Sequence, residues 1–468
     1  MAKKVQSRAA RRKARAVERA QQREQQQAVR QQLLARIAAV VTEVLEAALE
    51  AEVTARLGRP RYARRRTAPP RRTGLVCSRC QQDWAARLWR AGHYPRTLLL
   101  LFALVRLRVP RLACRCGGTV PLAFATLAPY QRTWADVQER ARQLAGLCLS
   151  LRDLREVLAM ESGQPLACST LNGWVQQAAP LAEALRAGPL ERVPPVVLLD
   201  GLWVKLSRET EATYTDRQGR QRHRRRHEKV PLLVAYAVDP ARGERWLLDW
   251  ELGEREDEAS WARLLERLRT RGLSTSAGLE LVIHDGSSGL EAAFGLVHFG
   301  PGLLRQRCVF HVLRNLRDAV RGEAGMTREA KRARRQAVLQ EAAALWQATD
   351  RTTVTRRKQA FEQQWAEREP KVVATLQAVW PHTLAYLAAL ERGRERGESW
   401  EARYLRTTSA LERVNRALRQ KARQVGVFHA ERGLLAALAL VLVHRHLGAD
   451  TAPDDLWTEV LEAGLLVA

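Results

Sequence analysis

Five apolar runs between residues 196 and 311 constrain the fold of this chain more than any other feature of its sequence. Short runs of this kind, bounded by polar and turn-forming residues, predict buried strands. The runs are Val196–Asp200, Val230–Val238, Arg245–Trp250, Leu279–Asp285 and a last one that ends in Cys308–His311. Helices are expected over residues 259–272 and before the fifth run. This order predicts an α/β core built on a mixed sheet.

Two of the predicted strands end in a carboxylate. Asp200 and Asp285 each close an apolar run and are followed at once by glycine. A carboxylate there is costly to bury unless a cation compensates it. With Glu412, which lies near the start of a predicted helix, these acids could hold two Mg²⁺ or Mn²⁺ ions for phosphoryl transfer. Each acid alone has a plain alternative, because Asp is common in turns and Glu412 fits a capping box.

The charge of the chain predicts a polyanionic partner. Its 78 Lys and Arg residues outnumber 50 Asp and Glu residues, so the formal net charge is +28. Phosphate contacts supply most of the non-specific affinity for nucleic acid, and double-stranded DNA is therefore expected. A solubilising basic surface is the alternative. We expect no secretory signal and no membrane span, since no apolar run approaches about 18 residues. A cytoplasmic, nucleoid-associated protein is expected.

The basic residues gather in three segments. Residues 1–30 read as a basic arm, and an amphipathic helix over 31–57 is expected to stop at Gly58. Residues 59–72 follow with seven Arg and no acid. They predict a strap on a phosphate backbone, or else a solvated linker. Residues 220–227 predict a basic hairpin tip. The expected DNA contacts in these segments are Arg64, Arg65, Arg66, Arg224 and Arg225.

Four of the seven cysteines form two close pairs. Cys77 and Cys80 make a CxxC turn, while Cys114 and Cys116 make a CxC turn followed by two glycines. Four thiolates brought together by such turns suit a structural Zn²⁺. The 33 residues between the pairs exceed the commonest ribbon spacing, and free buried thiols are the alternative.

Two helical regions flank the predicted strands. Residues 131–186 have a helix-turn-helix rhythm, in which the second helix begins at a Ser/Thr cap and points its first turn into the major groove. The residues expected to read DNA there are Ser169, Thr170 and Asn172. Such helix pairs also occur in unrelated bundles. Residues 312–400 read as helical and contain Trp346, Trp365, Trp380 and Trp400, most of them expected in a core. A last apolar helix is expected over residues 434–447.

Taken together, four motifs resemble the Mutator-like superfamily of DDE transposases, in its bacterial insertion-sequence branch. They are Asp200-Gly-x-Trp-Val-Lys, Asp285-Gly-x-x-Gly-Leu, Arg307-Cys308-x-x-His311-x-x-x-Asn315 and Thr407-Thr408-x-x-x-Glu412-x-x-Asn415. The resemblance covers residues 190–447 well and 34–72 more loosely. It implies that Asp200, Asp285 and Glu412 are the catalytic triad of an RNase H-like fold. Cys308 and His311 match the family's Cys-x2-His signature, in which His311 orients DNA, braces the site or simply packs.

The cysteine segment departs from the pattern of many members, so the chain resembles a zinc-bearing variant. The resemblance implies a transposase that binds the terminal inverted repeats of an insertion sequence, cleaves a strand and transfers it to target DNA as a homodimer. Two alternatives remain: a domesticated DNA-binding regulator that no longer cuts, and an RNase H-like nuclease acting on RNA or branched DNA. The expected division of the chain is a basic arm (1–30), a helix and strap (31–73), a zinc ribbon or knuckle (74–125), a helix-turn-helix domain (126–190), a catalytic core (191–315 and 401–468) and a helical insertion (316–400).

Overall fold

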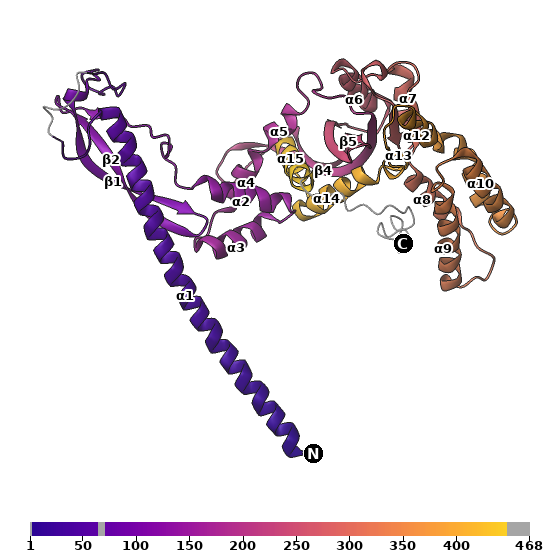
Figure 1. Ribbon diagram of the computed structural model, residues 1–468, viewed down its shortest axis with the longest axis horizontal. Helices are drawn as coiled ribbons and strands as arrows, with labels where there is room; N and C mark the ends of the chain where they lie inside the picture. Colours follow the sequence, from indigo (N-terminus) through magenta and orange to yellow (C-terminus); the bar gives the residue numbers. More distant parts are fainter. Residues whose placement is uncertain (1, 64–70, 447–468) are drawn as a thin grey trace. The chain divides into compact units, whose positions relative to one another are not determined.

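The computed structural model describes residues 2–63 and 71–446 (Figure 1). The chain forms two compact units. The first contains residues 1–142 and 151–174, and the second contains residues 143–150 and 175–468. Within the described ranges, no helix combines the length and apolar character needed to cross a membrane.

The first unit is built on one long helix and a hairpin. Helix α1 (Ala2–Leu57) ends where Gly58 adopts a φ of +65°, as the sequence predicted. It also includes the predicted basic arm, because the Arg, Lys, Gln and Ala of that segment all favour helix. Its C-terminal turns pack Leu49, Val53 and Leu57 against the hairpin. The strands are β1 (Leu88–Leu100), β2 (Ala103–Cys114) and the short β3 (Thr119–Val120), in an antiparallel sheet of order β1-β2-β3.

Four helices follow in the sequence, where helices were predicted. They are α2 (Ala135–Gly146), α3 (Leu151–Ser162), α4 (Cys168–Gln176) and α5 (Ala179–Ala184). Helices α3 and α4 are separated by a turn that contains Gly163, with a φ of +71°. The predicted Ser/Thr cap is wrong, since α4 begins at Cys168 and contains Ser169 and Thr170 in its first turn.

A five-stranded mixed sheet forms the centre of the second unit, as predicted. Its strands are β4 (Val196–Thr215), β5 (Gln221–Asp239), β6 (Glu244–Leu252), β7 (Leu281–His284) and β8 (Leu304–Arg307), in the order β6-β5-β4-β7-β8. β4, β5 and β6 pair antiparallel, whereas β7 and β8 run parallel to β4. The prediction that the fifth run ends in Cys308–His311 is wrong, because β8 ends at Arg307 and a helix begins at Val309. Helices α6 (Glu258–Thr270) and α7 (Ser288–Leu296) cover one face through Trp261, Leu264 and Leu290.

The β4–β5 hairpin extends far beyond the sheet. Its pairing runs from Val196 opposite Val238 to Thr215 opposite Gln221, and the side chains of its outer half are mostly exposed. The tip is the turn 216–220, in which Asp216 accepts hydrogen bonds from backbone N–H groups. The prediction that residues 220–227 form the tip is therefore wrong: residues 221–227 belong to β5.

The remaining helices complete the second unit. They are α8 (Val309–Ala319), α9 (Arg328–Leu345), α10 (Arg351–Trp365), α11 (Pro370–Val379), α12 (Ala385–Glu395), α13 (Arg403–Arg406), α14 (Ser409–Val425) and α15 (Glu431–His446). Side chains of Thr327 and Asp350 cap α9 and α10. Trp346, Trp365 and Trp400 are buried, and Trp380 is partly buried against Trp346. The predicted last helix is α15; its expected end, Leu447, lies outside the described residues.

Candidate active site

Asp200 and Asp285 lie side by side on neighbouring parallel strands. The pairing of β4 with β7 ends with Leu199 opposite His284, so the next residue on each strand is an acid. Asp285 follows the end of β7, as predicted. The prediction that Asp200 ends its strand is wrong, because β4 continues for fifteen residues to Thr215. What ends at Asp200 is only the pairing with β7, since the long hairpin partner β5 continues to extend β4.

Glu412 comes to this edge from α14. The N-cap of α14 is Thr408, whose side chain makes no capping hydrogen bond, and the Glu412 N–H donates to the Thr408 carbonyl at 2.8 Å. Ser409 is thus the first helical residue and Glu412 the fourth. A capping box needs the acid at the third position, so the capping alternative for Glu412 is wrong.

One turn later on α14, Asn415 makes direct contact with Asp200. Its side-chain Nδ2 donates to Asp200 Oδ2 at 2.7 Å, and its side chain is fully buried. Successive residues of a strand point to opposite faces. Leu199 packs on the α6 face, so Asp200 points to the face that α14 occupies. This hydrogen bond joins the helix that carries Glu412 to the strand that carries Asp200.

Cys308 connects the other elements of the site. Its backbone N–H donates to the carbonyl of His284 at 2.7 Å, at the end of β7. Its buried Sγ accepts hydrogen bonds from the N–H and the hydroxyl of Thr408, both at 3.2 Å. The Cys308 of the Cys-x2-His motif therefore ties the strand before Asp285 to the start of the Glu412 helix.

His311 lies on the first turn of α8, beside Glu412. Its Nδ1 is 3.6 Å from Glu412 Oε1. Burial alone would lower the pKa of His311, but Cys308, Glu412 and Asp200 raise it to about 10. The ligand atoms of Cys308, His311 and Glu412 lie within 4.8 Å of one another, a grouping that can hold a metal ion.

The negative charges of Asp200 and Glu412 are not fully compensated by neighbouring cationic side chains. Burial raises the pKa of Asp200, and the neighbouring Asp285 raises it further. Burial also raises the pKa of Glu412, with Asp200 adding to the rise. Glu412 Oε1 is buried without a hydrogen-bond partner. Within residues 2–63 and 71–446, no Lys or Arg forms an ion pair with either acid. Buried oxygens of this kind fit a hard divalent cation.

Arginines surround the acids at a greater distance. Arg314 on α8 and Arg419 on α14 act to lower the pKa of Glu412, against the stronger effect of burial. The Arg307 side chain lies on Gly286, where an added Cβ would come within 2.6 Å of its Nε. This Nε is buried and has no partner among the described residues. The guanidinium is thus held beside Asp285 as a half-buried cation, a group suited to binding phosphate.

Sequence reasoning missed a fourth acid in this region. Glu256 Oε1 lies 3.1 Å from the position that a Cβ on Gly201 would take. Its loop, between β6 and α6, carries no motif that would single it out from the acids on either side. Asn415 and Thr408 stood in the quoted motifs without a role, and only their contacts assign one.

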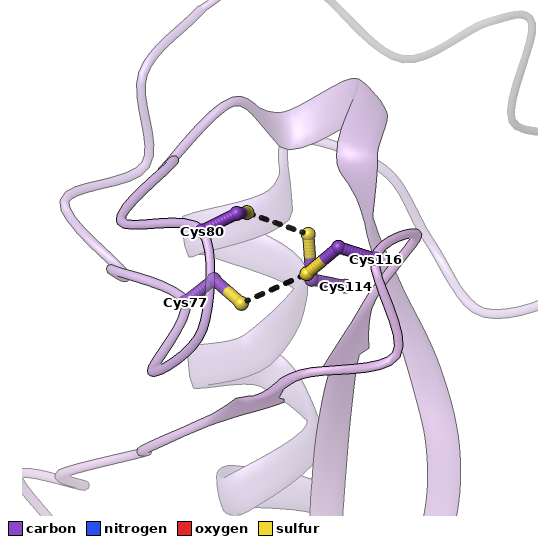
Figure 2. Close-up of side chains that lie close together, drawn as sticks. All are labelled: Cys77, Cys80, Cys114 and Cys116. Atoms are coloured by element: carbon purple, nitrogen blue, oxygen red, sulfur yellow. Dashed lines mark hydrogen bonds between the residues drawn. The ribbon is translucent and has the colours of Figure 1, made fainter.

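The four predicted zinc ligands come together in the first unit (Figure 2). Cys77 Sγ lies 3.5 Å from Cys116 Sγ, and Cys80 Sγ lies 3.6 Å from Cys114 Sγ. N–H groups of Cys80 and Arg79 lower the pKa of Cys77 to about 6. The Gln82 N–H acts to lower the pKa of Cys80, but the sulfurs of Cys116 and Cys114 raise it to about 11. Four thiols this close cannot all ionise without a cation, so the set fits Zn²⁺.

The predicted DNA contacts differ in exposure. Ser169 and Thr170 are exposed on α4, while Asn172 is half-buried. On the β4–β5 hairpin both Arg224 and Arg225 are exposed. Arg225 also pairs with Glu209 at 2.9 Å and donates to Ser207 and His429. Arg64, Arg65 and Arg66 lie outside the described residues.

Comparison with known proteins gives consistent results. The family described as "Transposase, Mutator family" matches residues 10–448. The transposase for insertion sequence element ISRM5 of Rhizobium meliloti (strain 1021) is 25% identical over 358 residues, covering 76% of this chain and 79% of that protein. The transposase for insertion sequence element IS406 of Burkholderia multivorans is 33% identical over 212 residues, covering 43% of this chain and 49% of that protein. A solved Drosophila P element transposase strand transfer complex is 11% identical, covers 70% of this chain and 80% of that one, and has a TM-score of 0.25, too low to carry an argument.

Proposed function

The chain belongs to the Mutator family of transposases and is a DNA transposase, and we propose that Asp200, Asp285 and Glu412 are the acids with which it cuts and joins DNA strands. The observation that carries the proposal is their convergence. Asp200 and Asp285 follow paired residues of β4 and β7, and the Asn415 hydrogen bond brings the Glu412 helix to Asp200.

The fold of the core is proposed to be RNase H-like. Three antiparallel strands followed by two parallel ones, in the order β6-β5-β4-β7-β8, support this assignment. So does the position of the acids, on the central strand, at the end of its parallel neighbour and on a later helix. The division of the chain into arm, strap, zinc ribbon, helix-turn-helix, core and insertion is part of the same proposal.

The acids are proposed to hold two Mg²⁺ or Mn²⁺ ions. When bound, such ions activate the attacking oxygen and stabilise the leaving one in an in-line phosphoryl transfer. The protein's own groups position this chemistry. Asn415 fixes the orientation of Asp200, and Cys308 holds the strand end and the α14 start together. His311 braces Glu412, and the half-buried guanidinium of Arg307 is assigned to a phosphate oxygen of the strand.

Two phosphoryl transfers are proposed in this one site. The first hydrolyses the strand at the end of the element and frees a 3′-hydroxyl, and the second uses that hydroxyl to attack target DNA. Both ends of the element have to be held together, so we expect a homodimer on DNA. Recognition of the terminal inverted repeats is assigned to the basic arm, the segment that carries the four clustered cysteines, and helices α3 and α4. The expected site of action is the nucleoid.

The test uses purified protein, Mg²⁺ and a duplex that carries the element's own terminal repeat. Asp285→Asn is expected to bind the duplex normally and to leave it uncut. Asp318→Asn is the matched control, because Asp318 is exposed and pairs with its neighbour Arg317 on the surface. Equal cleavage by wild type and Asp285→Asn would contradict the assignment. Binding by wild type without any cleavage would favour the non-cutting regulator.

The zinc assignment has its own test. Cys114→Ser is expected to lose about one Zn²⁺ per chain, measured by elemental analysis. Cys168→Ser is the control, because Cys168 lies outside the cluster. A wild-type protein purified without zinc, but folded and active, would contradict the proposal.

A further inference from the structure

Glu256 lies in the short loop between β6 and α6, at the same edge as Asp200 and Asp285. An added Cβ on Gly201 would come within 3.1 Å of Glu256 Oε1 and 3.4 Å of its Cδ. Since Gly201 directly follows Asp200, the Glu256 carboxylate lies against the backbone of the central strand. It approaches from the face covered by α6, whereas Glu412 belongs to the helix on the other face.

The loop is fixed on both sides. Its backbone at Glu256 and Asp257 lies so close to Gly289, at the start of α7, that an added Cβ would come within 3.0 Å of it. Asp257 caps α6 by accepting a hydrogen bond from the Ser260 N–H at 3.0 Å. The element after Asp285 and the helix after Glu256 therefore hold this loop between them. A carboxylate on such a loop has a defined position, which a chance surface acid lacks.

Glu256 has no cationic partner in the described part of the chain. Its side chain hydrogen-bonds with that of Trp203, whose indole N–H is the donor. Burial raises the pKa of Glu256, and Asp285 and Asp200 raise it further. The acid is thus half-buried among like charges, an arrangement that is unfavourable unless a cation compensates it.

Two buried atoms on the other side of Asp200 also lack partners. Glu412 Oε1 and Asn415 Oδ1 are buried and accept no hydrogen bond from any described residue. Asn415 is fully buried, and its other side-chain atom contacts Asp200. Unpaired oxygen acceptors thus lie on the α14 side of Asp200, and the Glu256 carboxylate lies on the α6 side; acceptors of this kind fit bound cations.

We propose that Glu256 is a fourth carboxylate ligand of the active site and helps Asp200 and Asp285 to hold a divalent cation. The inference rests on the proposed function of these two acids. It assigns Trp203 as a positioning residue, because the indole N–H holds the Glu256 side chain toward the central strand. Glycine at position 201 leaves room for this carboxylate, since an added Cβ would press on it.

The test measures cation binding directly, with the full chain loaded with zinc. Binding of Mn²⁺ is followed by the paramagnetic resonance signal of the free ion, and cleavage of the terminal-repeat duplex is measured in parallel. Glu256→Gln is expected to weaken Mn²⁺ binding by at least about tenfold. Its cleavage should fall at low Mn²⁺ and recover in part at high Mn²⁺. Glu254→Gln is the matched control, an exposed acid in the same loop that should behave as wild type.

Asp285→Asn separates this inference from the proposed function. Loss of Mn²⁺ binding and cleavage in Asp285→Asn, with Glu256→Gln equal to wild type, would overturn the role of Glu256 alone. Unchanged binding and cleavage in Asp285→Asn would overturn the proposed function and this inference with it. Should Glu256→Gln fail to fold, Glu256→Asp keeps the charge but shortens its reach. That variant should still bind Mn²⁺ more weakly, and wild-type binding would contradict the proposal.

Discussion

Replacing Glu412 by Gln is expected to stabilise the protein when divalent cations are absent, although it removes a group proposed to be catalytic. Glu412 Oε1 is buried without a hydrogen-bond partner, and the side chain is only 17% exposed. His311 compensates the charge only in part, since the pKa of Glu412 remains raised. An unsatisfied buried polar atom costs about 1–3 kcal/mol. Gln keeps an unpaired oxygen and loses only the charge. We therefore expect the free energy of unfolding to rise by about 1 kcal/mol, which corresponds to about 2–4 °C in Tm.

The assay is thermal unfolding of both proteins in cation-depleted buffer, without a chelator that would remove zinc. Addition of millimolar Mg²⁺ should raise the Tm of wild type, because a ligand bound only by the folded state stabilises it. The Gln variant should gain much less, so the order of the two Tm values should reverse. Glu431→Gln is the control, since Glu431 is an exposed acid in the first turn of α15.

The difference in Tm between wild type and Glu412→Gln should also depend on pH. A raised folded-state pKa means that the folded protein keeps this proton to a higher pH than the unfolded chain does. The stabilisation from the proton is therefore complete below the unfolded-state pKa and is lost as the pH rises through the folded one. We expect equal Tm values near about pH 4 and a growing advantage of Glu412→Gln toward neutral pH. A Gln variant that is less stable at every pH would show that Glu412 is instead held as a structural partner of His311.

Three further predictions concern other parts of the structure. Gly118→Ala should lower zinc content, because an added Cβ would lie 2.6 Å from Cys77 Sγ, whereas Gly295→Ala, with open space at its Cβ, should not. Arg224→Ala should weaken binding to all DNA sequences alike and reduce the slope of log affinity against log salt concentration by about one. Arg225→Ala, which breaks internal contacts, should mainly lower Tm. Asp249→Asn should lower the free energy of unfolding by about 3–5 kcal/mol in denaturant titrations, since this fully buried acid pairs with three arginines.

The strands and the pair of aspartates could be predicted because the signals are local. Four of the five runs are largely apolar over their own length, and Asp285 closes its run directly. The fifth strand, β8, reads Leu-Arg-Gln-Arg, and the apolar residues predicted to end it belong to α8 instead. The extension of β4 could not be predicted in this way. Residues 208–215 are mostly polar and exposed, so their strand conformation depends on pairing with β5 rather than on burial. The hairpin tip was misplaced for the same reason.

The location of Glu412 depended on the family resemblance, because no local signal separates it from a capping residue. What brings it to Asp200 is a set of contacts between residues far apart in the sequence. Asn415 reaches back 215 positions to Asp200, and Thr408 reaches back 100 positions to Cys308. Neither contact follows from periodicity or spacing. The role of Cys308 was equally hidden, since nothing in the sequence shows that its thiol accepts two hydrogen bonds from Thr408.

The two Asp-Gly pairs look alike in the sequence, but the glycines serve different neighbours. Gly286 has a φ of +82° and lies beneath the Arg307 side chain. The absence of a Cβ at residue 286 lets the Arg307 guanidinium lie next to Asp285. Gly201 belongs to an extended strand, where any residue fits the backbone, and the space beside it holds Glu256 Oε1. Gly286 thus leaves room for the Arg307 guanidinium, and Gly201 leaves room for the Glu256 carboxylate. A DNA phosphate held through divalent cations needs both: acids to hold the cations and a donor to bind the phosphate oxygens. Gly201→Ala should therefore weaken cation binding through Glu256, whereas Gly286→Ala should weaken DNA binding through Arg307.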